Sequence, residues 1–500
     1  MIRDFHPFLP YIVLLIVALA VTLLDTFRGA QGRSWFGWLT ALGALVALAL
    51  DQMGSDSSPW QGMIRFDGYS RAFNAVFLVT LALVSIGSAA EERKTGFAGE
   101  YYALLILSAM GLMLMGSAGG LLALYLGLEL STICLFALVG FAKREKRSAE
   151  AALKMLVLGA VASAVVLYGA SILYGVLGTT QFDKMAAEIA RNVGRPMPAL
   201  WLGLAMVIGG LGFKIAAAPF HLWAPDVYEG APATVTAYLS TASKAGGFAA
   251  LLRFLLSGMG GAADYWLIVV LLLAVLSMVI GNLVALTQTN FKRLLAYSGI
   301  AQAGYILVAI TGAAGGGSGM AVGAALMYLL LYAFTNVGGF LIAQAVADAT
   351  GSDEVKALRG LHRRSPLLAF SALVVLFSLG GIPPLAGFVG KIYLFAAGWE
   401  GGQQPLVLLG ALVSVIALYY YLIVARQVYI QDPQDDRRLS VARPLGLAIA
   451  VCVLGTLVIG IYPAPWVRMG AKAASALQPS LSESRIAQMT RMTAPDKRQP

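Results

Sequence analysis

The chain has 500 residues, of which 59% are hydrophobic and only 12% are charged. Soluble domains carry about a quarter charged residues, so this composition excludes a water-soluble globular protein. The formal net charge of +10 is explained without nucleic acid, because basic residues collect in the cytoplasmic loops of membrane proteins. No nucleic-acid partner is therefore expected.

Long apolar runs recur from one end of the chain to the other. A run of roughly 18 or more apolar residues can cross a ~30 Å hydrocarbon core as a helix. The run at residues 8–24 has no basic leader beyond Arg3 and no good cleavage site after it, so we expect a retained helix and not a signal peptide. We predict an all-α polytopic membrane protein of about 14 transmembrane helices, near residues 9–27, 36–51, 69–90, 101–117, 119–141, 149–177, 200–218, 232–256, 263–286, 294–312, 319–347, 366–398, 405–430 and 444–462.

The loops between these helices alternate in charge. When the N-terminus is placed outside, the inside loops carry most of the basic residues, and this bias predicts that both termini lie outside the cytoplasm. The basic tail, 466–500, is then an exception, which we interpret as a disordered or surface-lying extension. The inside set is Arg28, Arg33, Arg93, Lys94, Lys143, Arg144, Lys146, Arg147, Lys292, Arg293, Lys356, Arg359, Arg363, Arg364, Arg426, Arg437, Arg438 and Arg443. The outside set is Arg65, Lys184, Arg191 and Arg195, with Arg71 and Arg253 at helix edges.

Proline interrupts two of the predicted helices. Pro219 lies at the end of the seventh, and Pro383 and Pro384 break the twelfth, because proline cannot donate the backbone hydrogen bond that a helix needs. Five helices with a broken fourth occur twice, and a five-helix unit crosses the membrane an odd number of times, so the second copy is inverted. Inverted repeats with matching breaks indicate a transport site near the midplane. The expected order is three helices in 1–100, the first repeat in 101–256, the second in 257–430, a last helix in 431–465 and the tail in 466–500.

Four ionisable residues lie inside predicted helices, namely Glu129, Lys214, Lys244 and Lys391. Each costs about 2.5–3.5 kcal/mol at a helix centre, unless it pairs, faces a wet cavity or takes part in transport. We interpret Glu129 and Lys214 as a pair that exchanges protons, although Glu129 could also belong to a static ion pair. Lys244 would relay the proton, and Lys391, beside the second break, would release it. A lysine near a helix end more often extends to the interface, and Lys154 fits that description.

The stretch PFHLWAPDVYEGAP, residues 219–232, is too polar for a span and too patterned for a linker. His221, Asp226 and Glu229 could pass protons from the cytoplasm to the broken helix. His221 is the preferred member, because histidine titrates near neutral pH. The alternative is that these side chains satisfy backbone groups freed by the prolines and pin the loop.

Redox and nucleotide motifs are absent from the sequence. Cys134 and Cys452 are far apart, and His6, His221 and His362 are scattered. We therefore expect no iron–sulfur cluster, haem or structural zinc in this chain. No phosphate-binding glycine motif follows a strand-like run, so no cofactor-binding residues are predicted.

Four motifs together carry a specific resemblance: GFKIAAAPFHLWAPDVYEGAP, STASKAG, FKRLLAYSGIAQAGY and GGIPPLAGFVGKIYLF. They resemble the subunit N family of proton-pumping NADH:quinone oxidoreductase, respiratory complex I, whose mitochondrial counterpart is subunit 2. The resemblance covers roughly residues 120–400. It implies fourteen helices with two inverted five-helix repeats. It also implies proton-transfer roles for a glutamate in helix five and for lysines in helices seven, eight and twelve, which fall on Glu129, Lys214, Lys244 and Lys391.

The resemblance further implies a subunit of a bacterial cytoplasmic membrane complex that translocates protons. NADH, FMN, iron–sulfur clusters and quinone would belong to partner subunits, and other membrane-arm subunits and the bilayer would surround this chain. Three alternatives stay open. The chain could belong to a multisubunit cation/proton antiporter, which shares the broken helices and buried charges. It could be a structural spacer between pumping neighbours, or a chloroplast or cyanobacterial relative that takes electrons from ferredoxin.

Overall fold

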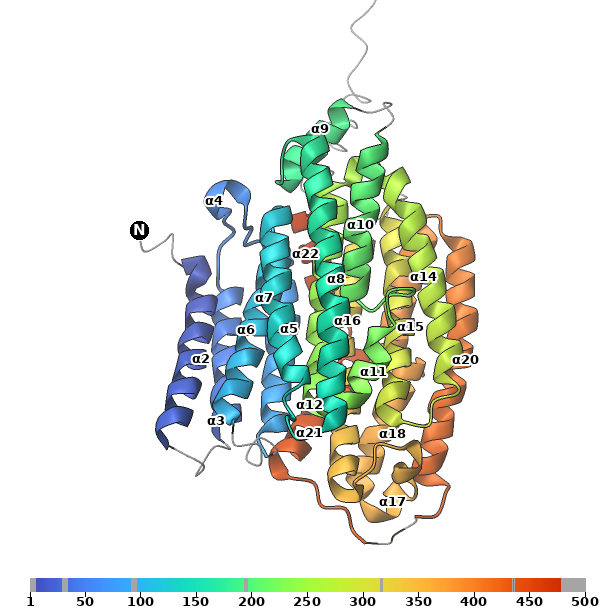
Figure 1. Cartoon of the computed structure of the whole chain (residues 1–500). Helices are drawn as coiled ribbons and strands as arrows, with labels where there is room; N and C mark the ends of the chain where they lie inside the picture. The colour runs from blue at the N-terminus through green and yellow to red at the C-terminus, as the bar shows by residue number, and fades with distance from the viewer. Residues whose placement is uncertain are drawn as a thin grey trace, which may run out of the picture.

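The structure, a computed structural model, describes residues 6–28, 35–90, 97–192, 197–314, 318–433, 435 and 437–477. Within these ranges the regular structure is helical, and β pairing is confined to isolated bridges. Most helices run along one common direction and form a bundle (Figure 1). The predicted loop residues Arg33, Arg93, Lys94 and Arg195 and the tail residues 478–500 lie outside the described residues.

Eleven helices in the described part of the chain are long and apolar enough to cross a membrane. Their length and composition confirm the predicted all-α polytopic fold class. They are α2 (Leu9–Arg28), α3 (Trp35–Gln52), α5 (Gly68–Ser88), α6 (Ala98–Gly116), α7 (Leu121–Val139), α8 (Lys146–Leu177), α14 (Ala263–Ala285), α15 (Phe291–Gly312), α16 (Ser318–Thr350), α20 (Gln404–Tyr429) and α21 (Arg443–Ile461).

Three further helical units correspond to the predicted helices seven, eight and twelve. The seventh and twelfth are each split in two, and the eighth is continuous but includes two π-helical turns. The total of about 14 spans therefore stays a prediction. The units are α10 (Pro198–Lys214) with α11 (Trp223–Gly230); α12 (Ala233–Tyr238), η2 (Leu239–Ser243), α13 (Lys244–Arg253) and η3 (Phe254–Gly258); and α18 (Pro366–Gly380) with α19 (Ala386–Glu400). Short elements are η1 (His6–Phe8), α4 (Pro59–Gly62), α9 (Phe182–Arg191), η4 (Gly260–Ala262), η6 (Val355–Leu358), α17 (Leu361–Arg364) and α22 (Ala464–Leu477).

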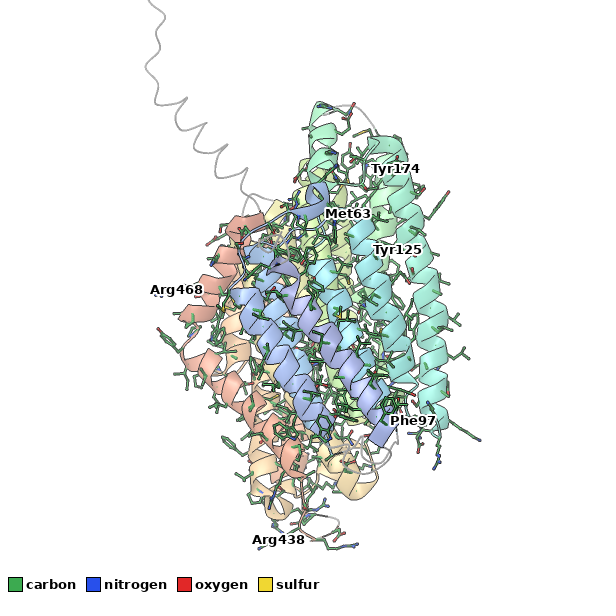
Figure 2. The ribbon with its side chains drawn as sticks, turned by 90° about the vertical axis from the view of Figure 1, so that its left-hand side faces the viewer. Met63, Phe97, Tyr125, Tyr174, Arg438 and Arg468 are labelled. Atoms are coloured by element: carbon green, nitrogen blue, oxygen red, sulfur yellow. The ribbon has the colours of Figure 1, made fainter. Side chains whose placement is uncertain are left out.

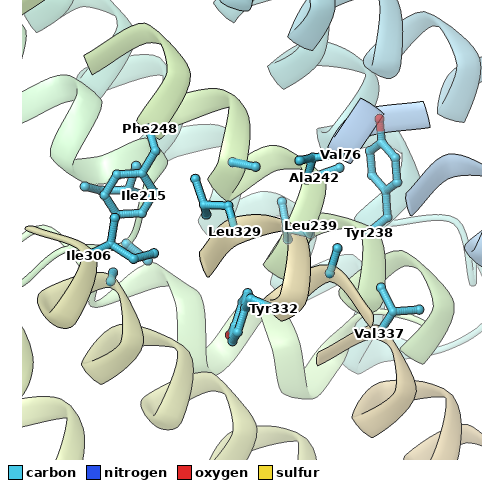
Figure 3. Packing of buried hydrophobic residues seen from close by; sticks show 14 of the residues in the cluster. Val76, Ile215, Tyr238, Leu239, Ala242, Phe248, Ile306, Leu329, Tyr332 and Val337 are labelled. Atoms are coloured by element: carbon cyan, nitrogen blue, oxygen red, sulfur yellow. The ribbon is translucent and has the colours of Figure 1, made fainter. Parts of the chain in front are cut away.

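The centre of the bundle is built around α15 and α16, which are buried along almost their whole lengths. Figure 3 shows Ile306 of α15 and Tyr332 of α16 among side chains of the eighth unit, including Leu239 and Phe248. The most apolar windows of α2 and α8 are only 28% and 22% buried, so these helices lie at the periphery. Their outward side chains project from the bundle (Figure 2), as expected of surfaces that lipid tails cover.

Glycines bring neighbouring helices together in both halves of the chain. A Cβ on Gly111 of α6 would lie 2.5 Å from the backbone nitrogen of Ser131 on α7. A Cβ on Gly281 of α14 would likewise lie 2.5 Å from the backbone nitrogen of Ala301 on α15. Only glycine permits so close an approach of two backbones. In both predicted repeats, the first two helices therefore pack closely through a glycine on the first helix.

The two halves start at opposite ends of the bundle. α6 begins after Phe97, at the lower end in Figure 2. α14 begins after η4, which packs on α9 at the upper end in Figure 1. The first helices of the two halves therefore run antiparallel, as an inverted pair requires, whereas the repeat itself stays a prediction. The predicted boundary at residues 100 and 101 falls inside α6, because Glu100 lies in its first turn, where a carboxylate complements the helix dipole.

The start of the predicted tail is a packed helix and not a loose extension. α22 covers residues 464–477 and packs against α5 and α16. Its buried residues, Gly470, Ala473, Ala474 and Leu477, follow helical spacing. For 464–477 the structure therefore contains the surface-lying alternative, in the form of a helix that the sequence analysis did not identify. α22 ends beside η3, where Ser257 Oγ donates to the carbonyl of Leu477.

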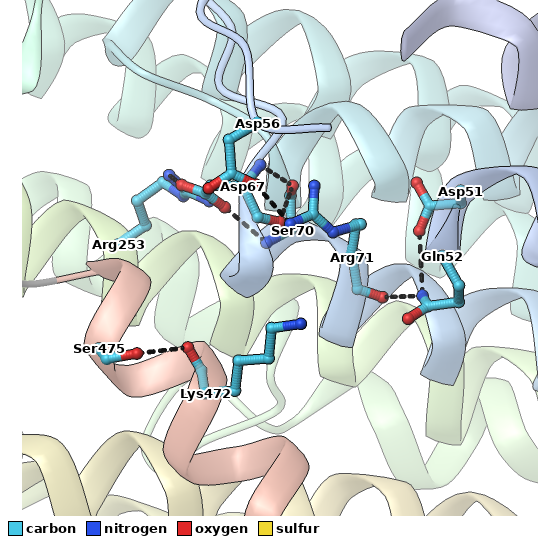
Figure 4. A network of polar contacts seen from close by, with 9 residues as sticks. All are labelled: Asp51, Gln52, Asp56, Asp67, Ser70, Arg71, Arg253, Lys472 and Ser475. Atoms are coloured by element: carbon cyan, nitrogen blue, oxygen red, sulfur yellow. Dashed lines mark hydrogen bonds and ion pairs between the residues drawn. The ribbon is translucent and has the colours of Figure 1, made fainter. Parts of the chain in front are cut away.

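A buried ion pair joins α13 to the start of α5 (Figure 4). Both terminal nitrogens of Arg253 lie 2.8 Å from the carboxylate oxygens of Asp67. Asp67 also accepts the backbone N–H of Ser70, which caps α5. Burial raises the pKa of Asp67, but the charge and hydrogen bonds of Arg253 outweigh it and leave that pKa below its ordinary value. Arg253 is 1% exposed, so it depends on this carboxylate for charge compensation.

Candidate functional site

The first helix break follows Lys214 directly. α10 ends at Lys214 and not at residue 218 as predicted, and α11 resumes at Trp223. The Ala218–Pro219 peptide between them is cis. The backbone N–H of Ala218 is not lost to solvent, because it donates to Ser277 Oγ at 2.8 Å. The break therefore places Lys214 at a helix end inside the bundle.

The second break separates α18 from α19. Gly380 ends α18, Gly381 has a positive φ of 83°, and the Pro383–Pro384 peptide is cis. Ser378 Oγ accepts the backbone N–H of Gly387 at 3.0 Å, which ties the two half-helices together. The break leaves backbone carbonyls at the end of α18 without helical partners, and these carbonyls become part of the site.

The three predicted lysines are enclosed by the bundle. Lys214, Lys244 and Lys391 expose only 7%, 2% and 5% of their surface. None of them reaches the interface, so the alternative of a lysine extending to the membrane surface does not describe them. Lys154 does behave in that way, because its side chain is 43% exposed and contacts the carboxylate of Glu150 at 2.8 Å.

Lys214 and Glu129 approach the same stretch of α7 but do not touch. Lys214 Nζ donates to Ser131 Oγ at 3.2 Å and to Thr132 Oγ1 at 3.0 Å. The Glu129 carboxylate instead accepts a hydrogen bond from Ser163 Oγ of α8. No direct ion pair joins Glu129 to Lys214 among the described residues, so the predicted pair is separated in this conformation.

A small cavity lies beside Lys214 and reaches Ser163, the serine that donates to Glu129. It has a volume of about 20 Å³ and is lined by Lys214, Thr132 and Ser163. This volume is enough for about one water molecule. Such a water would connect Lys214 to Ser163, which already holds Glu129. On its other side Glu129 lines an apolar groove of about 800 Å³ between α7 and α8.

Lys244 lies at the end of the π-helical turn η2. Its Nζ donates to the backbone carbonyl of Gly299 on α15 at 2.6 Å. A Cβ on Gly299 would lie 3.0 Å from both Lys244 Nζ and Tyr332 Oη, so the absence of a side chain makes room for the ammonium group. The hydroxyl of Tyr332 is buried and has no hydrogen-bond partner among the described residues. π turns often mark functional positions, and here one precedes the most deeply buried of the three lysines.

Lys391 folds back onto the second break. Its Nζ donates to the carbonyls of Leu379 and Gly380 at 3.1 and 3.2 Å and to Ser414 Oγ of α20 at 2.9 Å. These carbonyls form the negative end of the α18 dipole, which favours a cation. The break therefore gives Lys391, which is on α19, hydrogen-bond acceptors at the end of α18.

One helix connects the surroundings of the last two lysines. Gly299 of α15 accepts from Lys244, and Gln302, one turn further, donates to the carbonyl of Leu379 at 3.2 Å. That carbonyl also accepts from Lys391. Tyr328 of α16 donates to the side-chain oxygen of Gln302. A band of buried polar groups therefore extends across α15 from one lysine to the next.

The three candidate side chains of the polar stretch 219–232 have two different kinds of surroundings. Asp226 contacts Lys154 at 2.9 Å and Arg293 at 2.7 Å, and Glu229 contacts Arg293 at 3.1 Å. These ion pairs fasten α11 to α8 and α15, so they fit the alternative in which the carboxylates pin the loop. His221 differs, because it is 6% exposed and its Nδ1 has no hydrogen-bond partner among the described residues.

The family described as "NADH:quinone oxidoreductase/Mrp antiporter, TM" matches residues 118–417, which include both breaks and all three lysines. The chain belongs to this NADH:quinone oxidoreductase/Mrp antiporter family. NADH-quinone oxidoreductase subunit N of Heliobacterium modesticaldum is 43% identical over 466 residues, which cover 92% of this chain and 96% of that protein. The resemblance to subunit N that the motifs predicted is confirmed.

Solved structures agree on the fold of this family. A chain of respiratory complex I from Thermus thermophilus superposes with a TM-score of 0.78 at 33% identity and covers 93% of this chain and 100% of that one. A chain of the Mrp complex from Dietzia sp. superposes with a TM-score of 0.83 and covers 97% of this chain and 99% of that one, but only 19% of residues are identical. The second likeness shows the fold alone. Both structures share the fold, so it is the sequence identity to subunit N that favours the oxidoreductase branch over the antiporter alternative.

Several residues of the site escaped the sequence analysis. Gln302 lies in a quoted motif of the family resemblance but was given no role, and Ser163, Tyr328 and Tyr332 were not singled out. The only available signal was Gln302, an uncharged polar residue in the middle of a predicted membrane helix. Serines and tyrosines in apolar helices usually pack or bond locally, so the sequence alone does not distinguish them.

Proposed function

We propose that this chain is the proton-translocating subunit N of the membrane arm of a bacterial NADH:quinone oxidoreductase. One observation carries the proposal: three lysines lie enclosed in the bundle, each held by uncharged acceptors on a different helix. An ammonium held by neutral oxygens can lose its proton without leaving a partner carboxylate uncompensated. Groups of this kind are suited to relaying protons more than to holding helices together.

The proposed relay starts at Glu129 and ends at Lys391. Glu129 and Lys214 exchange a proton through Ser163 and one water in the cavity beside Lys214. Lys244 receives the proton next, and the polar groups along α15 lead from Lys244 to Lys391. Lys391 releases it. A change imposed from outside on the interaction between Glu129 and Lys214 would drive the cycle.

His221 is the proposed site of proton uptake. It lies inside the first break, where its Nδ1 has no hydrogen-bond partner among the described residues, and histidine is the side chain best suited to exchanging protons with water. Asp226 and Glu229 would hold the neighbouring helix in place through Arg293 and Lys154. His221 would therefore load the relay without itself joining an ion pair.

A neighbouring subunit of the membrane arm would contact this chain at the groove beside Glu129. The open apolar groove beside Glu129 leaves a carboxylate at the edge of the lipid phase, where it is costly unless another helix covers it. We infer that a neighbouring membrane-arm subunit packs there. NADH, FMN, iron–sulfur clusters and quinone would be held by other subunits. Both termini would face the periplasm, the two five-helix halves would be inverted repeats, and the membrane would be the bacterial cytoplasmic membrane.

The proposal is tested by proton pumping against NADH:quinone activity in membranes that carry Lys214→Ala. Assembly of the complex is checked first, and Lys184→Ala, an exposed lysine of α9, is the matched control. Loss of both pumping and coupled turnover in Lys214→Ala alone supports the relay. Normal pumping by an assembled Lys214→Ala complex would instead make the chain a structural spacer.

A further inference from the structure

A polar pocket of about 750 Å³ opens at the end of the bundle where α17 lies, the lower end in Figure 1. It is formed by the segment after α16 and by the segment before α21. Figure 2 shows Arg438 at this end. The lining includes five basic and two acidic side chains, which are Lys356, Arg359, Arg364, Arg437, Arg438, Glu354 and Asp435.

Most of the basic side chains in this pocket form no ion pair with a carboxylate of the described residues. Only Arg437 pairs with a carboxylate among the described lining residues, at 2.8 Å from Asp435. Arg364 is 9% exposed, and its Nε donates to the neutral backbone carbonyl of Arg437 at 3.3 Å. A guanidinium group has five N–H donors, so Arg364 keeps donors for another acceptor. An anion in the pocket would satisfy them.

An apolar groove continues from the pocket along the outer surface of the bundle. It has a volume of about 500 Å³ and lies between α18 and α21. Leu367 and Leu454 line it and are 82% and 61% exposed. A Cβ on Gly446 would meet only Val441, at 3.8 Å, so this glycine keeps the groove open.

Leu439 joins the groove to the pocket. It lines both, and its backbone N–H donates to the carbonyl of Arg364 at 3.1 Å. Along α21 the groove extends from Gly446 to Leu457. At 1.5 Å per residue this is about 17 Å, close to half of the ~30 Å hydrocarbon core. The groove is therefore about as long as one acyl chain in one leaflet.

We propose that the pocket and the groove together form a binding site for one anionic diacyl phospholipid. The phosphate binds Arg364, Lys356 and Arg438, and an acyl chain lies in the groove between α18 and α21. Basic pockets at the ends of membrane helices favour anionic head groups over zwitterionic ones. The general accumulation of basic residues in inside loops does not account for the site, because that rule requires neither an enclosed pocket nor an adjoining apolar groove.

The test uses the intact complex in liposomes that contain a trace of photoreactive phosphatidylglycerol or phosphatidylcholine, each with a diazirine in its acyl chain. Labelling of α18 and α21 is mapped by peptide mass spectrometry. The account predicts that phosphatidylglycerol labels these helices roughly tenfold more than phosphatidylcholine. The head-group variant Lys356→Gln with Arg438→Gln should remove this preference, and Gly446→Leu should reduce labelling by both lipids. Both changes fall on exposed or open positions, so the fold is expected to survive.

Two controls match these changes in chemistry. Arg144→Gln with Lys146→Gln removes two exposed charges at the same end, outside the pocket. Gly175→Leu adds a side chain to α8 at a position with nothing within 4 Å. Neither should alter labelling of α18 and α21. Equal labelling by the two lipids, or an equal effect of the controls, would overturn the proposal. The absence of labelling would also overturn it, because a protein partner would then cover the groove. An unchanged result for Gly446→Leu would overturn it as well, because the site would then bind phosphate alone.

Discussion

Gln302 and Lys391 share one acceptor, the backbone carbonyl of Leu379. The carbonyl is available because α18 ends one residue later, at Gly380. The helix break therefore places a side chain from α15 and the lysine from α19 on one oxygen atom. This shared acceptor links Lys391 through hydrogen bonds to α15, the helix whose Gly299 carbonyl accepts from Lys244.

Replacing Gln302 by leucine should interrupt this connection. The Leu379 carbonyl would keep Lys391, but the Tyr328 hydroxyl would lose its buried acceptor. We expect proton transfer to slow by roughly tenfold, equivalent to about 1.4 kcal/mol. The rate of proton transfer is measured as NADH-driven proton pumping into membrane vesicles, per assembled complex. Gln344→Leu on α16, whose amide bonds Asp348, is the control, and equal rates in the two variants would contradict the prediction.

A methyl group on Gly299 should disturb Lys244. In Gly299→Ala the new Cβ would lie 3.0 Å from Lys244 Nζ and Tyr332 Oη, so the ammonium must move away from the carbonyl that holds it. We expect pumping to fall while assembly is retained. Gly339→Ala adds the same methyl group at 3.4 Å from a leucine methyl, an ordinary contact. The prediction fails if both variants pump like the unaltered complex.

Ser163 should matter because it holds Glu129 at the cavity. Ser163→Ala removes the hydroxyl that donates to the carboxylate and lines the cavity beside Lys214. We expect coupled turnover to decrease, whereas Ser371→Ala, which removes a hydroxyl bonded within its own exposed helix turn, should change nothing. Steady-state NADH:quinone activity with and without an uncoupler separates the two outcomes. Full coupling in Ser163→Ala would show that Glu129 does not depend on this contact.

The ion pair between Asp67 and Arg253 should contribute stability and not transport. Asp67→Asn leaves the Arg253 charge buried, and breaking such a pair costs about 3–5 kcal/mol. Because the pKa of Asp67 is lower in the folded state, this stability is present above the unfolded pKa of about 4 and is lost as the pH falls through the folded pKa. Thermal unfolding of the purified complex at several pH values measures it. Asp56→Asn, which removes an ion pair whose carboxylate is 67% exposed, should cost less than about 1 kcal/mol.

The sequence predicted the helices and the lysines because both depend on chemistry that is local to the chain. Apolar runs define spans, prolines mark breaks, and a lysine within such a run is conspicuous. The partners of these lysines could not be predicted in the same way. Lys244 and Lys391 bond backbone carbonyls of Gly299 and Leu379, and every residue has a carbonyl, so only the fold reveals which of them is accessible.

The expected contact between Glu129 and Lys214 shows a second limit. Lys214 is buried inside the bundle, but helical rotation directs Glu129 toward α8 and the open groove there, while Lys214 reaches Ser131 and Thr132. Sequence spacing does not determine which face of a neighbouring helix a long side chain meets. For the same reason α22 was missed, since its buried stripe consists of small residues whose burial depends on α5 and α16.

The most direct test of the relay is proton pumping by complexes that carry Lys214→Ala, Lys244→Ala or Lys391→Ala, and all three changes together, with Lys184→Ala as the control. If the three lysines form one path, each single change should reduce pumping to the same residual level, and the triple variant should be no worse than any single one. Normal pumping by an assembled Lys244→Ala complex, whose change removes the middle of the path, would contradict the account.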